Sequence, residues 1–125
     1  MTKPLALIYY ENLLPGSQLA NRLHELGYRV QVVESAGLDQ LTELSEKEKP
    51  ILVVVEVSHQ TSVCPSISKL KKNTATAHIP VLAFAVDPDK ALTAESKEAG
   101  ASLLAGSKAI LEQLPQLLDQ ILQVE

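Results

Sequence analysis

The chain has 125 residues, of which 46% are hydrophobic and 21% charged, and this composition excludes an intrinsically disordered protein. The length suits a single domain of residues 1–125, with a core that must be aliphatic because only 3% of the residues are aromatic. The net charge of −4 disfavours nucleic-acid binding, which needs a basic surface.

The single cysteine, Cys64, excludes an internal disulfide and fits a reducing compartment. The apolar stretch at residues 5–10 is too short to span a membrane, and no cleavage-like site follows it. We therefore expect a soluble cytoplasmic protein that does not bind to a membrane.

The first three elements alternate between strand and helix. Residues 5–10 are an apolar run suited to a buried strand. Residues 17–27 repeat leucine at helical spacing, with Ser17 placed to cap the helix and Gly27 placed to end it. Residues 28–33 alternate between apolar and polar side chains, which predicts a strand with one wetter face.

The middle of the chain continues the alternation. Residues 37–49 carry one leucine stripe and a charged tail, which predicts a helix. The run "ILVVVE" begins at Ile51 and is apolar up to Glu56, which is typical of a parallel strand buried on both faces. Residues 65–73 predict a short helix with Pro65 in its first turn.

The last third adds two strands and two helices. Residues 79–86 and 101–106 predict strands, and residues 87–100 predict a helix that ends at a glycine. Residues 109–123 bring apolar side chains onto one helical face. Because proline removes a helical hydrogen bond, Pro115 predicts that the final helix begins there, after a looser turn.

Five strand–helix alternations with short connections predict an α/β fold. Parallel strands need crossover helices, and such helices cover both faces of the sheet. We therefore expect a single-domain, doubly wound parallel sheet of five strands in the flavodoxin-like order 2-1-3-4-5.

Three passages resemble the receiver domains of response regulators. "KNTATAHIPVLAFAV" (72–86) is similar to their third-helix to fourth-strand passage, "KEAGASLLAG" (97–106) to the turn before their fifth strand, and residues 19–41 to their first helix and second strand. The resemblance covers nearly the whole chain and implies the CheY-like form of the fold.

The resemblance also implies where phosphoryl-transfer chemistry would lie. Receivers phosphorylate an aspartate after the third strand, using two acidic residues for Mg²⁺, a Thr or Ser after the fourth strand and a Lys after the fifth. Here the two acidic positions fall on Tyr9 and Tyr10, and the acceptor position falls on Glu56. The hydroxyl position falls on Ala85, and the lysine position falls on Ser107, with Lys108 one place late.

These replacements resemble a degenerate pseudo-receiver, the class that includes domains of cyanobacterial clock proteins. The resemblance then implies a non-phosphorylatable protein-interaction module in signalling, with no enzyme activity, metal or cofactor. An atypical receiver that accepts phosphate on another group ranks last among the alternatives, because tyrosines replace the residues that would hold Mg²⁺.

Two interpretations remain open for Glu56 and for the tyrosines. Glu56 either mimics a phosphorylated aspartate or is a solvated acid at a strand end, and the solvated acid is preferred. Tyr9 and Tyr10 either form an aromatic contact surface or fill the vacated metal pocket, one packing inward and the other capping it, and filling is preferred.

A rival function uses the same end of the sheet. Glu56 could act as a base, with His59 or Cys64 assisting, in a small flavodoxin-like enzyme or ligand-binding protein. No Asp or Asn is identifiable to orient the imidazole, so this function remains the alternative. A large apolar pocket beside Glu56 would favour it.

The receiver resemblance also implies an interaction face, made of residues 88–98, 101–105 and 114–122. Glu95 and Asp119 are its candidate contact residues, and a second copy of the chain or a signalling kinase, regulator or output protein is its candidate partner. The basic group Lys69, Lys71 and Lys72 is expected to be solvated and to play no part.

Overall fold

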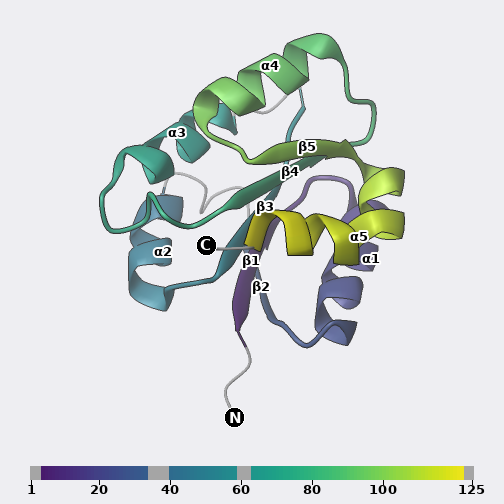
Figure 1. Ribbon diagram of the computed structural model, residues 1–125, viewed down its shortest axis with the longest axis horizontal. Coiled ribbons are helices and arrows are strands. Elements are labelled where there is room, and N and C mark those ends of the chain that lie inside the picture. The colour runs from purple at the N-terminus through teal and green to yellow at the C-terminus, as the bar shows by residue number, and fades with distance from the viewer. Residues whose placement is uncertain (1–3, 34–39, 59–62, 123–125) are drawn as a thin grey trace.

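The computed structural model describes residues 4–33, 40–58 and 63–122, and strands alternate with helices along it (Figure 1). The strands are β1 (Leu5–Tyr9), β2 (Arg29–Val33), β3 (Leu52–Glu56), β4 (Val81–Ala85) and β5 (Leu103–Gly106). The helices are α1 (Leu13–Glu25), α2 (Leu41–Glu48), α3 (Cys64–Lys72), α4 (Lys90–Ala99) and α5 (Ser107–Leu122).

The strands form one parallel sheet in the order β2-β1-β3-β4-β5. This confirms the predicted doubly wound sheet of order 2-1-3-4-5. Helices α1 and α5 cover one face of the sheet, and α2, α3 and α4 cover the other (Figure 1). None of the described helices is long and apolar enough to cross a membrane.

The unbroken apolar run of β3 follows from its central position. Val53 and Val55 pack into the core beneath α2, α3 and α4, whereas Val54 packs into the core beneath α1 and α5. Because successive side chains of a strand point to opposite faces, a strand covered on both sides must be apolar at every position. Glu56 is therefore the exception in β3 that needs an explanation.

Helix α1 begins four residues earlier than predicted, so Ser17 is not its cap. Asn12 is the N-cap residue, and the Ser17 hydroxyl donates to the Leu14 carbonyl at 3.3 Å from inside the helix. Pro15 fits in the first turn because the first N–H groups of a helix have no intrahelical acceptor. The predicted end is confirmed, since Gly27 follows the helix with φ of 100°.

The prediction that the final helix begins at Pro115 is wrong, because α5 starts at Ser107 and continues through Pro115. Proline cannot donate to the carbonyl of Leu111, yet the helix continues on both sides of it. The buried side chains Ile110 and Leu118 lie before and after the proline and pack on the same core. Burial on the sheet thus outweighs the lost hydrogen bond.

The remaining helices differ from the predicted ranges mainly at their first residues. Helix α4 begins at Lys90 because the Asp89 carboxylate accepts from the Leu92 N–H at 2.8 Å and caps it, and it ends as predicted at Gly100, with φ of 118°. Helix α3 begins one residue early, at Cys64, and α2 ends at Glu48, while residues 37–39 lie outside the described residues.

Lys71 is not the solvated surface residue that the sequence predicts. Its Nζ atom donates to the carbonyl of Ala77 at 2.9 Å and to that of Ile79 at 2.8 Å, and burial lowers its pKa. Its stem lies against Gly100, where an added Cβ would approach the Lys71 Cγ to 2.5 Å. This lysine therefore fixes the passage between α3 and β4 against the end of α4.

Candidate functional site

Glu56 is buried at the carboxyl end of β3, with 1% of its surface exposed. Its Oε1 atom accepts hydrogen bonds from the backbone N–H of Glu11 at 2.7 Å and of Asn12 at 3.0 Å. The side-chain amide of Asn12 donates to Oε2. The interpretation of Glu56 as a solvated strand-end acid is therefore wrong, because the loop after β1 closes over the carboxylate.

The loop between β1 and α1 explains why a carboxylate is tolerated here. Asn12, the N-cap residue of α1, makes no side-chain capping bond to its own helix. Its amide points instead to Glu56, which brings a negative charge to the positive end of the α1 dipole. Charge-assisted hydrogen bonds of this kind offset the cost of burying a carboxylate.

A second carboxylate, Glu11, lies beside the first and is exposed. Its Oε2 atom accepts from the Tyr9 hydroxyl at 3.0 Å, and its Oε1 atom accepts from the Ser58 hydroxyl at 3.0 Å. Each of the four carboxylate oxygens of Glu11 and Glu56 thus accepts at least one hydrogen bond from the protein.

The two tyrosines have separate roles in this loop. Tyr9 is buried and packs into the core beneath α2, α3 and α4, as expected of one of the pair. The ring of Tyr10 lies on Gly16 in α1, where an added Cβ would come within 2.0 Å of the Tyr10 Cγ. Gly16 is therefore required for the close approach of the ring, and Tyr10 packs with the α1 and α5 core.

The remaining positions of the degenerate pocket carry no comparable polar group. Ala85 ends β4, is buried and has no hydroxyl to offer. Ser107 and Lys108 are the first two residues of α5, directly after β5, and Lys108 is exposed. Glu56 accepts its hydrogen bonds from Glu11 and Asn12, and Lys108 is not among these donors.

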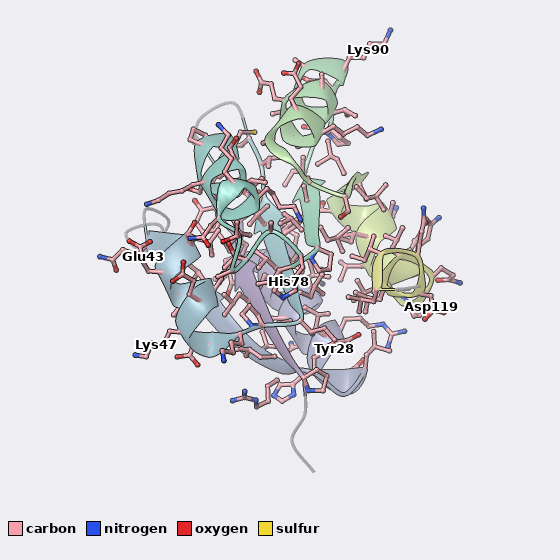
Figure 2. The ribbon with its side chains drawn as sticks, turned by 60° about the vertical axis from the view of Figure 1, so that its left-hand side comes forward. Tyr28, Glu43, Lys47, His78, Lys90 and Asp119 are labelled. Atoms are coloured by element: carbon pink, nitrogen blue, oxygen red, sulfur yellow. The ribbon has the colours of Figure 1, made fainter. Side chains whose placement is uncertain are left out.

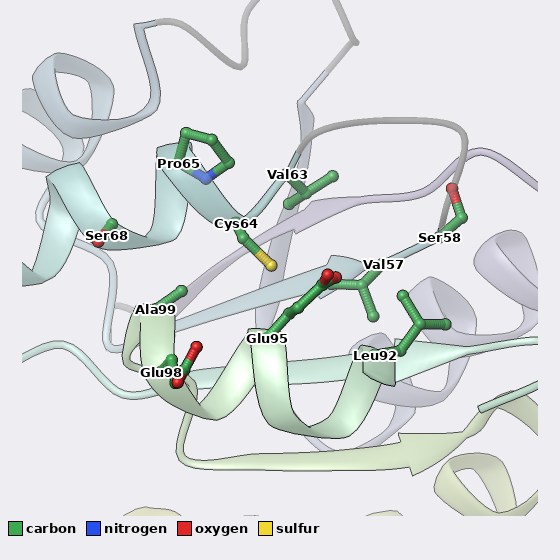
Figure 3. A pocket seen from close by; sticks show the side chains of 10 residues that line it. All are labelled: Val57, Ser58, Val63, Cys64, Pro65, Ser68, Leu92, Glu95, Glu98 and Ala99. Atoms are coloured by element: carbon green, nitrogen blue, oxygen red, sulfur yellow. The ribbon is translucent and has the colours of Figure 1, made fainter. Parts of the chain in front are cut away.

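A cavity of about 550 Å³ opens between α3 and α4 (Figure 3). Its walls include Ser58, Cys64 and Glu95, but Glu56 is not among the residues that line it. Burial and the nearby Glu95 carboxylate raise the pKa of the Cys64 thiol, which makes it a poor nucleophile at neutral pH. His59 lies outside the described residues.

The geometry does not favour the alternative function, in which Glu56 acts as a base with help from Cys64. Glu56 does not line the cavity that Cys64 lines, and the Glu56 carboxylate accepts hydrogen bonds from donors of the chain. His24 and His78 are exposed side chains on other parts of the surface. Among the residues that the structure describes, no three His, Cys, Asp or Glu side chains are grouped so that they could hold a metal ion.

The two candidate contact residues come from helices on opposite faces of the sheet. Figure 3 shows the Glu95 side chain directed from α4 toward Cys64, into the cavity between α3 and α4. Asp119 is exposed on α5, on the other face of the sheet (Figure 2). Burial, and to a lesser degree the charge of Asp119, raises the pKa of Tyr28, which lies directly before β2. The structure thus directs Glu95 toward α3, and the joint role of Glu95 and Asp119 in an interaction face remains a prediction.

Three residues of the site were not predicted from the sequence: Asn12, Gly16 and Ser58. The signal for Asn12 is present, because an asparagine between a strand and a helix is a preferred N-cap. No sequence signal shows that its amide bonds to a residue 44 positions away. Glu11 was noticed in the sequence, but its bonds to Tyr9 and Ser58 depend on the fold.

The sequence matches no protein-family model and no curated protein. Solved structures do match. A protein named as a response regulator from Chloroflexus aurantiacus aligns with a TM-score of 0.82 at 18% identity, over 97% of this chain and 98% of that one. A response regulator from Thermotoga maritima aligns with a TM-score of 0.78 at 20% identity, over 97% and 98%.

The chemotaxis response regulator CheY4 of Vibrio cholerae aligns with a TM-score of 0.79 at 14% identity, over 96% of this chain and 99% of that one. At these identities the similarity shows the fold alone, which is the CheY-like receiver fold. The resemblance found in the sequence is therefore confirmed at the level of the fold.

Proposed function

We propose that this chain is a pseudo-receiver, a protein-interaction module of signal transduction that is not phosphorylated. The observation that carries the proposal is the closed hydrogen-bond network around Glu56. This glutamate stands where the receiver resemblance places the phospho-acceptor, and the loop after β1 already occupies both of its oxygens.

A phospho-acceptor must present a free carboxylate oxygen to the phosphodonor, with a cation alongside to draw off charge. The oxygens of Glu56 instead point toward the N-terminus of α1, and the side chain is buried. Tyr9 and Tyr10 supply no carboxylate for a cation, and Ala85 supplies no hydroxyl for a phosphoryl oxygen. The chain thus holds a buried, hydrogen-bonded carboxyl group at the position where receivers are phosphorylated.

The partner in this proposal is a protein: a signalling kinase, a regulator, an output protein or a second copy of the chain. Receivers change state when the fourth-strand hydroxyl moves toward the phosphoryl group, and Ala85 cannot make that movement. The surface of α4, β5 and α5 is therefore held in one state, and binding depends on the presence of the partner and not on a switch.

The chemistry is tested by incubation with Mg²⁺ and acetyl phosphate, followed by intact-protein mass spectrometry. We expect no acyl-phosphate adduct, while a receiver that retains its aspartate is modified in the same tube. An adduct that peptide mapping places on Glu56 contradicts the proposal. An adduct on another group supports the atypical receiver.

The interaction surface is tested by charge reversal at residues that the structure separates. Asp119→Lys probes the α5 surface, Glu95→Lys probes the cavity between α3 and α4, and Lys72→Glu is the control on a different surface. Self-association is measured by light scattering, and partner affinity by calorimetry once a partner is purified. Loss of binding only in Lys72→Glu would place the interface on α3.

A further inference from the structure

A groove lies at the end of the sheet opposite to Glu56, where the strands begin. Its walls come from the residues before β3, β4 and β5, from α3 and from the last turn of α5, and its volume is about 480 Å³. Figure 1 shows the loop between α3 and β4 and the end of α5 on this side of the sheet. The volume is within the range of small-molecule sites, roughly 300–1,000 Å³.

The wall of this groove is mostly apolar. Its apolar lining residues are Pro50, Ile51, Pro80, Ile121 and Leu122. Ile51 is 43% exposed, although the residues that follow it in β3 are buried. The groove therefore leaves apolar surface in water that the apolar body of a ligand would cover, and covering such surface is favourable.

One cation, Lys71 of α3, lines this apolar groove. Its Nζ atom is held by the carbonyls of Ala77 and Ile79, at 2.9 Å and 2.8 Å. An ammonium group has three N–H donors, and these carbonyls accept two of them. One donor therefore remains for a ligand, and using it costs little conformational entropy because the side chain is already fixed.

The charge of Lys71 is not compensated by the rest of the structure. Its two acceptors are neutral carbonyl groups, and it forms no ion pair with any residue that the structure describes. Among the described residues that line the groove there is no Asp or Glu. Burial lowers the pKa of Lys71, as expected of an ammonium that loses water and gains no carboxylate. A ligand carboxylate would supply the missing negative charge.

We propose that this groove binds an organic monocarboxylate with an apolar body. The carboxylate accepts the remaining donor of the Lys71 ammonium in a charge-assisted hydrogen bond. The exposed side chains of His78 and Ser102, which also line the groove, offer further donors. The apolar body lies on the apolar wall that includes Ile51. This site shares no residue with the hydrogen-bond network around Glu56.

The test is a titration of the ¹⁵N-labelled chain with phenylbutyrate at neutral pH and constant ionic strength, observed by two-dimensional NMR. Phenylbutanol, which keeps the apolar body without the charge, and acetate, which keeps the charge without the body, are titrated in parallel. We expect saturable shifts at the amides of Ile51, Lys71 and Ser102 with phenylbutyrate. Phenylbutanol and acetate should each bind weaker by roughly tenfold or more, the effect of losing one charge-assisted hydrogen bond or the apolar contact.

The ammonium of Lys71 gives a second measurement that needs no substitution at this residue. A neighbouring negative charge favours the charged form of a lysine, so bound phenylbutyrate should raise the pKa of Lys71. Bound phenylbutanol should not raise it. The pKa is followed through the side-chain NMR signals of Lys71 during a pH titration with and without each ligand.

A pair of variants tests the apolar wall. Ile51→Ser should weaken phenylbutyrate binding by roughly fivefold because it removes apolar surface from the groove. Val32→Ser is the matched control, since Val32 is likewise an exposed apolar residue but lies on β2, away from the groove. It should leave the affinity unchanged.

Several results would overturn the proposal: no saturable shift with phenylbutyrate, equal affinity for phenylbutyrate and phenylbutanol, or equal affinity for phenylbutyrate and acetate. An unchanged pKa of Lys71 in the saturated complex would also overturn it, because the ammonium is the group that selects the carboxylate. So would an equal effect of Ile51→Ser and Val32→Ser, which would show that the ligand does not lie on this wall.

Discussion

Asn12 and Glu56 are joined twice, although 44 residues separate them in the chain. The backbone N–H of Asn12 donates to Oε1 of Glu56 at 3.0 Å, and its side-chain amide donates to Oε2. The carboxylate therefore fixes the start of α1 to the end of β3. In this respect Glu56 is a structural residue, whatever its charge contributes to partner binding.

The first prediction concerns the stability that this carboxylate provides. Glu56→Gln places an amide N–H₂ where an acceptor stood, opposite the donors of Glu11 and Asn12. We expect the free energy of unfolding to fall by about 1–3 kcal/mol, and to fall further in Glu56→Leu, which leaves the buried N–H groups unpaired. Urea denaturation measures both variants.

The matched control for this prediction is Glu112→Gln, an exposed acid on α5. It should change the free energy of unfolding by less than about 0.5 kcal/mol. If Glu56→Gln is as mild as the control, the hydrogen bonds to Glu56 contribute nothing to stability.

The second prediction concerns the contact of Tyr10 with Gly16. Alanine is favoured over glycine inside a helix by about 1 kcal/mol. Without the Tyr10 ring, Gly16→Ala would therefore stabilise α1. Because the new Cβ would meet the Tyr10 ring, we expect the variant to be destabilised instead. Thermal and urea unfolding measure the change.

A double-mutant cycle isolates the cause of that effect. In a Tyr10→Ala background the added methyl group has space, so Gly16→Ala should then be neutral or stabilising. An equal penalty in both backgrounds would show that the ring is not what excludes a side chain at Gly16.

The third prediction uses the unpartnered hydroxyl in α2. Thr42→Val removes a buried hydroxyl that forms no hydrogen bond and keeps the shape of the side chain. We expect the free energy of unfolding to rise by about 1 kcal/mol. Thr76→Val is the matched comparison, and it should lower stability because it removes the bond to the Leu70 carbonyl. Changes of equal sign in the two variants contradict this account.

The fourth prediction concerns the pH dependence of Cys64. Its thiol pKa is raised, first by burial and then by Glu95, so the reactive thiolate forms only at higher pH than in a free cysteine. The rate of alkylation by iodoacetamide should rise with pH and reach its midpoint above that of free cysteine. Glu95→Gln should shift the profile to lower pH, whereas Glu112→Gln should not move it.

Much of the fold follows from the sequence alone. The unbroken apolar run that begins at Ile51 can be satisfied only between two helical layers, and Gly27 and Gly100 end their helices through a local backbone property, positive φ. These signals lie within a few residues of the structure they determine. The buried strand β3 and the ends of α1 and α4 could be predicted for that reason, whereas the strand order was predicted from the alternation of strands with crossover helices.

Other features depend on groups that are distant in the chain. Pro115 is accommodated inside α5 because side chains on both sides of it pack on the sheet, which no local rule for proline contains. Glu56 looks like a solvated acid in the sequence, because its donors come from a different strand–helix loop. A buried carboxylate is stable only where donors converge on it, and only the tertiary structure brings those donors together.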